Sequence, residues 1–277
     1  MKTSTTKTTT ARTAFDSSLP IDTVLLKIDD FRQVTDEQLE NLRTLFNCYG
    51  FVVIEHAPTD KPEVQLLEVG KLLGTPNVHD RANEQGIVSM APQEGLEGYL
   101  GTSNAEHPLH TDGAYDEVPP RLLCLQCEQH AVTGGDSVLV SAKGLYEWLK
   151  ANHPESIEAL QEPDVLTVER VNRKGTKAIL QKTDDLMEIV WRDDFTTTFA
   201  NRPNITAAIE HIRSYIHDPA NQVTFKLMPN QIILADNMGV LHGRTAFEKG
   251  DKRKLNRTNN NGDSEFSKKL IFGFGQL

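Results

Sequence analysis

The chain has 277 residues, of which 38% are hydrophobic and 25% are charged, and its formal net charge at pH 7 is −10. This composition is typical of an ordinary soluble globular protein and excludes a disordered one. The excess of acidic side chains disfavours binding to nucleic acid or to an anionic membrane surface, and no apolar stretch approaches the roughly 20 residues that span a bilayer. Three cysteines, an odd number, give no disulfide framework and indicate a reducing compartment.

The N-terminal segment is rich in Thr, Ser, Lys and Arg, and it lacks the apolar stretch of a secretory signal. We therefore expect a disordered tail over residues 1–18, then one folded domain over residues 19–277, in a cytoplasmic protein. The sequence leaves the oligomeric state open and does not exclude a homo-oligomer.

The periodic segments alternate between the two kinds of secondary structure. Asp36 can cap a helix that has its apolar residues at helical spacing and ends at Gly50. Short strands and three more helices follow: we expect strands over residues 51–54, 137–141, 165–171, 178–180, 186–191, 224–227 and 231–235, and helices over residues 62–73, 143–152 and 204–217. Many short strands without a βαβ rhythm predict a mainly β fold with flanking helices, a barrel or a jelly roll.

His110 and Asp112 form the most informative short motif, because residues two apart on a strand point to the same face. One imidazole and one carboxylate need only a third ligand to form a 2-His-1-carboxylate triad, which leaves three positions of an octahedral Fe(II) open. His242 is the candidate for that ligand, since it follows an apolar strand and a turn. His107 should point away from His110 in a strand. Each pattern alone also fits an ordinary structural histidine.

Two arginines follow His242 and have the same parity as Leu255, so a strand would place Arg253 and Arg257 on one face. An inward-facing guanidinium is costly to bury unless it meets an anion, and its fork of donors suits a carboxylate. The alternative is a solvated charged edge, which Lys252 and Lys254 favour for part of this segment.

These motifs together carry a family resemblance. In chain order they are His110-Thr111-Asp112, Gly134-Gly135-Asp136-Ser137, His242-Gly243-Arg244 and Arg253 to Arg257. The sequence resembles Fe(II)/2-oxoglutarate-dependent dioxygenases of the taurine dioxygenase (TauD/TfdA) type, with similarity to γ-butyrobetaine hydroxylases and clavaminate synthase-like hydroxylases. This resemblance implies a double-stranded β-helix, that is, a cupin-like jelly roll.

The resemblance also implies roles for individual residues. His110, Asp112 and His242 match the iron ligands, and Arg253 and Ser137 match the residues that bind the distal carboxylate of 2-oxoglutarate. Arg257 matches an arginine that binds an anionic group of the substrate. The implied reaction uses O2 as a further co-substrate, hydroxylates a C–H bond of a small anionic or zwitterionic molecule, and releases succinate and CO2.

Further residues are expected around the substrate. Three of them lie in a Gly-bounded loop before the metal motif, namely Tyr99, Leu100 and Thr102. A fourth, Tyr115, follows the motif closely. A substrate contact and a structural role are equally open for His107. For Arg192, which could reach a zwitterionic substrate, we favour a solvated strand end, and for Cys124 and Cys127 we favour buried small side chains.

The sequence does not identify the substrate, and it leaves other functions open. The same oxidant could serve desaturation, epoxidation or cyclisation. A barrel-fold binding protein without turnover and a zinc hydrolase are the alternatives of other classes, and the second is disfavoured because no general base stands beside the ligands.

Overall fold

Two sheets form the centre of the computed structural model, which describes all residues except 1–11, 94–99, 171, 184–185 and 276–277. The larger sheet has the strand order β1-β2-β13-β5-β15-β3 and the smaller one β12-β6-β14-β4. Two three-stranded sheets, β11-β7-β8 and β16-β10-β9, lie beside them. Every pairing among the described strands is antiparallel except that of β1 with β2.

The strands are β1 Leu25–Lys27, β2 Phe51–Glu55, β3 Val88–Met90, β4 His107–His110, β5 Leu122–Gln129, β6 Ser137–Ser141, β7 Leu166–Arg170, β8 Arg173–Lys177, β9 Leu180–Thr183, β10 Leu186–Ile189, β11 Thr197–Phe199, β12 Gln222–Phe225, β13 Gln231–Asp236, β14 Val240–Arg244, β15 Lys254–Asn260 and β16 Phe274–Gly275. The α-helices are α1 Asp36–Tyr49, α2 Pro62–Leu73, α3 Ala142–Asn152, α4 Pro154–Leu160 and α5 Pro203–Ile216. The expected mainly β fold with flanking helices is confirmed.

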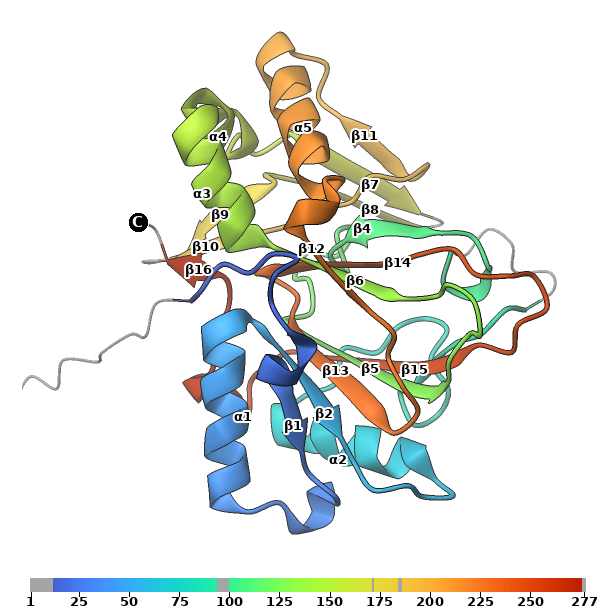
Figure 1. Cartoon of the computed structure of the whole chain (residues 1–277). Helices are drawn as coiled ribbons and strands as arrows, with labels where there is room; N and C mark the ends of the chain where they lie inside the picture. Colours follow the sequence, from blue (N-terminus) through green and yellow to red (C-terminus); the bar gives the residue numbers. More distant parts are fainter. Residues whose placement is uncertain (1–11, 94–99, 171, 184–185, 276–277) are drawn as a thin grey trace, which may run out of the picture.

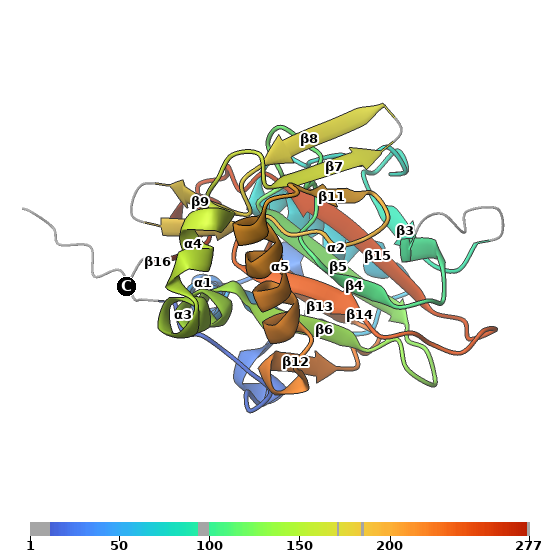
Figure 2. The same cartoon turned by 90° about the horizontal axis from the view of Figure 1, so that it is seen from above.

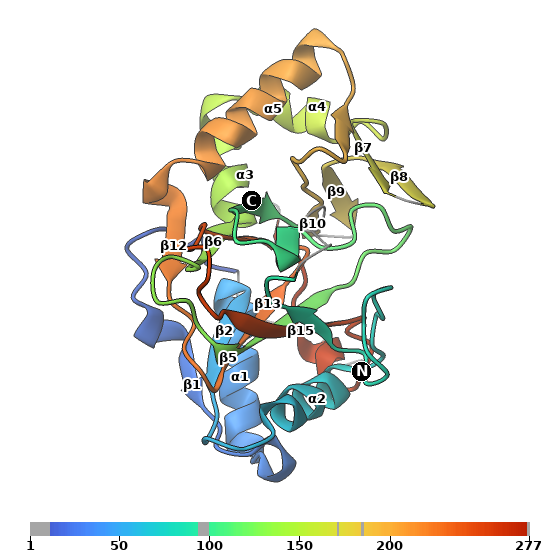
Figure 3. The same ribbon diagram turned by 90° about the vertical axis from the view of Figure 1, so that its right-hand side faces the viewer.

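The helices cover the two sheets from opposite sides. Figures 1 and 3 show α1 and α2 on the outer side of the larger sheet and α3, α4 and α5 on the side of the smaller one. Figure 2 shows the hairpin of β7 and β8 with β11 as a small sheet beside α5, and its apolar side chains share a core with α3 and α5. Among the described residues, no helix has the length and apolar character needed to cross a membrane.

Strand β2 is buried on both faces, and this explains its continuous apolar sequence. Its side chains alternate between two cores. Val52 and Ile54 pack with α1 and α2, whereas Phe51 and Val53 pack between the two sheets. The larger sheet is therefore packed on both faces at β2.

The start of the ordered chain differs from the expectation. Arg12 is buried and forms an ion pair with Asp236, and the amide of Thr13 donates to the carbonyl of Cys48. Phe15 packs edge-on against Phe51. The predicted tail over residues 1–18 is therefore wrong for residues 12–18, while residues 1–11 lie outside the described part.

Other local differences follow from capping and pairing. Thr35, not Asp36, caps α1, and its side chain and that of Gln38 form a reciprocal capping box. Helix α4 was not expected from the sequence. The strand predicted over residues 178–180 is displaced, because β9 begins at Leu180 to pair with β10.

Candidate active site

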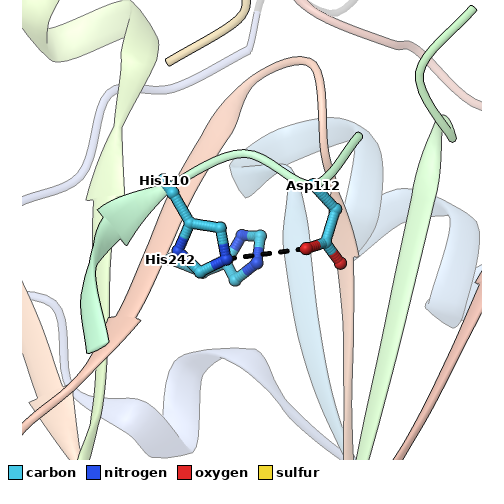
Figure 4. A group of neighbouring side chains, drawn as sticks. All are labelled: His110, Asp112 and His242. Carbon is cyan, nitrogen blue, oxygen red and sulfur yellow. Dashed lines mark ion pairs between the residues drawn. The ribbon is translucent and has the colours of Figure 1, made fainter. Parts of the chain in front are cut away.

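Two neighbouring residues of the sequence, His110 and Asp112, meet the distant His242 at the edge where β4 ends. His110, Asp112 and His242 each offer one donor atom within 4.8 Å of the other two, so they could hold one metal ion. His110 Nε2 lies 3.5 Å from Asp112 Oδ1, and the rings of His110 and His242 have centroids 4.4 Å apart. Figure 4 shows the two imidazoles side by side, with the carboxylate facing them.

Strand pairing brings these residues together. His242 on β14 is the register partner of His110 on β4. The next paired residues are Arg244 and His107, so β4 has one more residue than β14 between the two pairs. This bulge reverses the parity expected for His107, whose ring stacks on that of His110 with centroids 4.2 Å apart. The prediction that His107 points away from His110 is therefore wrong.

The protonation states suit a divalent cation. Burial lowers the pKa of His242 to about 3, and the neighbouring His110 adds to the effect, so its imidazole is neutral at pH 7. Burial alone would raise the pKa of Asp112, but the neighbouring Arg257 guanidinium holds that pKa well below its usual range. His110 Nδ1 lies 2.9 Å from the carbonyl of Pro108, which fixes that nitrogen as a donor and leaves Nε2 as a ligand atom. This donor set fits Fe(II).

Two asparagines that were not predicted as site residues hold Asp112 in place. The Asn237 side chain accepts from the amide of Asp112 at 2.7 Å and donates to its carbonyl at 2.9 Å. Asn259 Nδ2 donates to Asp112 Oδ2 at 3.0 Å. Arg257 donates to the other carboxylate oxygen at 3.0 Å. Only the turn at Asn237 gave a sequence signal, because it lies between an apolar strand and His242.

Two cavities border the metal donors, and the second of them is lined by His110 and His242. Its wall includes Ser137, His242, Arg253, Leu255 and Arg257, so Arg253 and Arg257 share a face as expected. Arg253 is 6% exposed, and burial lowers its pKa to about 10, which leaves it cationic at pH 7. No carboxylate in the described part of the chain pairs with it. A buried guanidinium without a carboxylate partner is a candidate binding group for an anionic ligand.

The Gly-Gly-Asp-Ser turn shapes this cavity. Gly135 has a φ of +69°, and a Cβ there would lie 3.1 Å from Arg253 Cδ. Glycine therefore allows both the left-handed backbone and the close approach of the arginine. Ser137 follows on β6 as the register partner of Arg244. The motif brings the serine hydroxyl and the guanidinium to one cavity.

A first, more polar cavity opens on the other side of His110 and Asp112. Three of the residues predicted to lie around the substrate line it, namely Leu100, Tyr115 and Arg257, and so does His107. Thr102 is buried but is not among the residues that line either cavity. Tyr99 lies outside the described residues.

Several arginines in this first cavity were not expected. Arg192 is 8% exposed, pairs with Asp194 and lines the cavity, so the interpretation as a solvated strand end is wrong. Arg81, Arg170 and Arg173 also line it. No motif marks these residues in the sequence, because loops and a hairpin bring them to the cavity.

Cys124 and Cys127 are both buried, as expected, and neither forms a disulfide. Burial raises the pKa of each thiol to about 12. A redox or metal role is therefore disfavoured for this pair.

Comparison with known proteins places these features in a family. The family model described as "Taurine catabolism dioxygenase TauD, TfdA family" matches residues 13–259. Trimethyllysine dioxygenase of Meyerozyma guilliermondii is 26% identical over 273 residues, covering 89% of this chain and 65% of that protein. Human gamma-butyrobetaine dioxygenase is 27% identical over 154 residues, covering 51% and 40%. This chain thus spans less than two thirds of the length of both relatives. Uridine-5'-phosphate dioxygenase of Amycolatopsis is 24% identical over 229 residues, covering 74% and 82%.

Solved structures share the fold. An asparagine oxygenase in complex with Fe(II), 3-hydroxyasparagine and succinate aligns with a TM-score of 0.67 at 17% identity, over 86% of this chain and 94% of that chain. The non-heme iron oxygenase OrfP with Fe, succinate and (3S)-hydroxy-L-Arg aligns with a TM-score of 0.69 at 15% identity, over 84% and 83%. The expected double-stranded β-helix is confirmed. On the family match over residues 13–259, the chain belongs to the TauD/TfdA family of Fe(II)- and 2-oxoglutarate-dependent dioxygenases.

Proposed function

We propose that this protein is an Fe(II)/2-oxoglutarate-dependent oxygenase that hydroxylates a C–H bond of a small anionic or zwitterionic substrate and releases succinate and CO2. One observation carries the proposal. The buried cation Arg253, which has no carboxylate partner among the described residues, lies in a cavity whose wall also includes His110 and His242. A dicarboxylate that reaches from the metal ligands to Arg253 satisfies both ends of this cavity.

The proposal gives each residue a role. His110, Asp112 and His242 hold Fe(II), which together with 2-oxoglutarate activates O2 for oxidation of a C–H bond. Arg253 donates a bidentate pair of hydrogen bonds to the distal carboxylate, and the Ser137 hydroxyl donates to the same group. The cavity wall formed by Leu123, Leu125 and Leu255 keeps water from the co-substrate.

On the substrate side, Arg257 binds an anionic group. Its partner in this structure is Asp112, and Fe(II) bound to that carboxylate would weaken the ion pair. The named substrates of the first two relatives carry a trimethylammonium group, but the first cavity does not suit one. Tyr115 is the one Phe, Tyr or Trp among the described residues lining it, and the guanidinium carbons of Arg170 and Arg173 both lie 5.6 Å from its ring centroid. An aromatic cage for a quaternary cation is therefore disfavoured.

The first test is spectroscopic. Anaerobic addition of Fe(II) and 2-oxoglutarate should give a weak visible charge-transfer band, and air should then convert 2-oxoglutarate to succinate. His242→Ala should lose both signals, whereas His217→Ala, at an exposed histidine, should keep them. Tight 2-oxoglutarate binding without succinate would favour a binding protein instead. Mass spectrometry of the products from a substrate panel separates hydroxylation from desaturation, epoxidation and cyclisation.

A further inference from the structure

A second group of possible metal ligands lies outside the two cavities, where α4 packs against α5 (Figures 1 and 3). His153, Glu155 and His211 each offer one donor atom within 4.8 Å of the other two. None of the three lines either cavity. Among the described residues, this is the one group besides the active-site donors that could hold an ion. The proposed function leaves it without a role.

The end of one helix and the start of the next fix the backbone at His153. Its amide donates to the carbonyl of Leu149 at the end of α3, and Pro154 then begins α4 at a position where its missing N–H is not needed. The His153 side chain makes no capping hydrogen bond for α4. Glu155 lies in the first turn of that helix, and His211 comes from α5. The His153 imidazole is therefore available for another role, beside a carboxylate and a second imidazole.

The two imidazoles have the separation that a shared ion requires. Their rings stack with centroids 3.6 Å apart and planes 14° apart. Two nitrogen ligands of one tetrahedral zinc ion, each about 2.0–2.1 Å from the metal, lie about 3.4 Å from each other. His153 Nδ1 is 3.9 Å from Glu155 Oε1, too far for a hydrogen bond but close enough for an ion to bridge them. Because the rings are nearly parallel, the His153 ring must rotate about its Cβ–Cγ bond to direct both lone pairs at one ion, and its side chain is 30% exposed.

A buried hydroxyl group orients the second imidazole. Ser156 is 2% exposed, and its Oγ lies 2.9 Å from His211 Nδ1. When Nδ1 donates to this hydroxyl, Nε2 carries the lone pair that a metal needs. Histidine ligands in metal sites are commonly held in this way, by a hydrogen bond at the nitrogen that does not bind the metal. The His211 ring therefore has the kind of support that a metal ligand requires.

We propose that His153, Glu155 and His211 form a second metal site, which binds Zn(II) and links α4 to α5. Two imidazoles and one carboxylate are a donor set of zinc, and a water molecule completes the tetrahedron. All three side chains are at least partly exposed, so an ion reaches them directly from solvent. An ion that binds only the folded chain stabilises it, so this site has a structural role that does not depend on turnover.

Equilibrium dialysis against Zn(II), followed by metal analysis, tests this inference on the protein without a polyhistidine tag. Because zinc also fits the active-site donors, the informative quantity is the difference between variants. His211→Ala should bind one zinc ion per chain fewer than the unmodified protein. His242→Ala should keep the ion at the second site, and the double variant should lose it. Glu155→Gln should bind this ion more weakly, since an amide oxygen is a poorer zinc ligand than a carboxylate.

Thermal unfolding gives a second measurement. At a free zinc concentration 100-fold above the Kd, the ion should raise the unfolding midpoint of His242→Ala by about 5 °C, and the added His211→Ala change should remove this gain. His217→Ala is the matched control, because this exposed histidine directly follows α5 and belongs to neither group. Equal zinc contents of the unmodified protein and His211→Ala, an equal loss in His217→Ala, or a midpoint that zinc does not change overturns the inference. The comparison of the unmodified protein with His211→Ala decides the question even if His242→Ala does not fold.

Discussion

The hydrogen bond from Asn259 to Asp112 should contribute directly to metal affinity. Asp112 is fully ionised in its buried position, and its Oδ2 accepts from Asn259 Nδ2 at 3.0 Å. Loss of a partner that orients a metal ligand typically costs 10–100-fold in affinity. The same size follows from a hydrogen bond to a charged group, which contributes about 1.5–3 kcal/mol. We therefore expect Asn259→Ala to weaken Fe(II) or Mn(II) binding by about 10–100-fold.

The neighbouring residue provides the matched control. Asn260 is also buried, but on a strand its side chain points to the opposite face, where Nδ2 donates to the carbonyls of Gly70 and Gly74 at 3.1 Å each. Asn260→Ala should lower the unfolding midpoint and leave metal affinity unchanged. Anaerobic competition titration against a fluorescent chelator measures the affinity. Equal affinities for Asn259→Ala and the unmodified protein, or equal losses in the two variants, would refute the reasoning.

Two further predictions concern stability. Arg12→Met should lower the free energy of unfolding in urea by about 3–5 kcal/mol, because it leaves the Asp236 carboxylate buried without its cation. The double variant with Asp236→Asn should recover part of this loss. A loss below about 1 kcal/mol would show that the N-terminal segment contributes little to stability. In the metal-free protein, burial lowers the pKa of His79 to about 4, below its value of about 6.5 in the unfolded chain. Between about pH 6.5 and pH 4 the unfolded chain therefore binds more protons than the folded one, so stability falls as the pH drops through this range. His79→Gln should flatten that dependence of the unfolding midpoint on pH, and an unchanged slope would assign the acid sensitivity to other groups.

The sequence predicts the centre of the site because local rules suffice there. Strand parity places His110 and Asp112 on one face. The apolar strand β13 and the turn after it predict where the strand that carries His242 begins. Strand parity predicts the wrong direction for the His107 side chain because β4 has a bulge. This bulge depends on the register with β14, and no residue type within β4 indicates it.

Long-range polar contacts could not be predicted for a related reason. Arg12 and Asp236 are separated by 224 positions, and a polar N-terminal segment with one buried arginine has the composition of a tail. Asn237 and Asn259 belong to a residue type that is common in turns and strand ends. Their role depends on which carboxylate lies opposite them, and tertiary packing alone decides that.

The two sheets make different contributions to the site, and this arrangement explains why the fold suits the proposed reaction. The smaller sheet provides His110 and His242 from paired strands, so their separation is set by backbone hydrogen bonds. The larger sheet provides Arg253 just before β15 and Arg257 within it. In the proposed function, a dicarboxylate between the sheets would reach from the metal site to Arg253, a cation in apolar surroundings, where the attraction is stronger than in water. Because His110, His242 and Arg257 belong to strands, we expect little reorganisation of these side chains when the co-substrate binds.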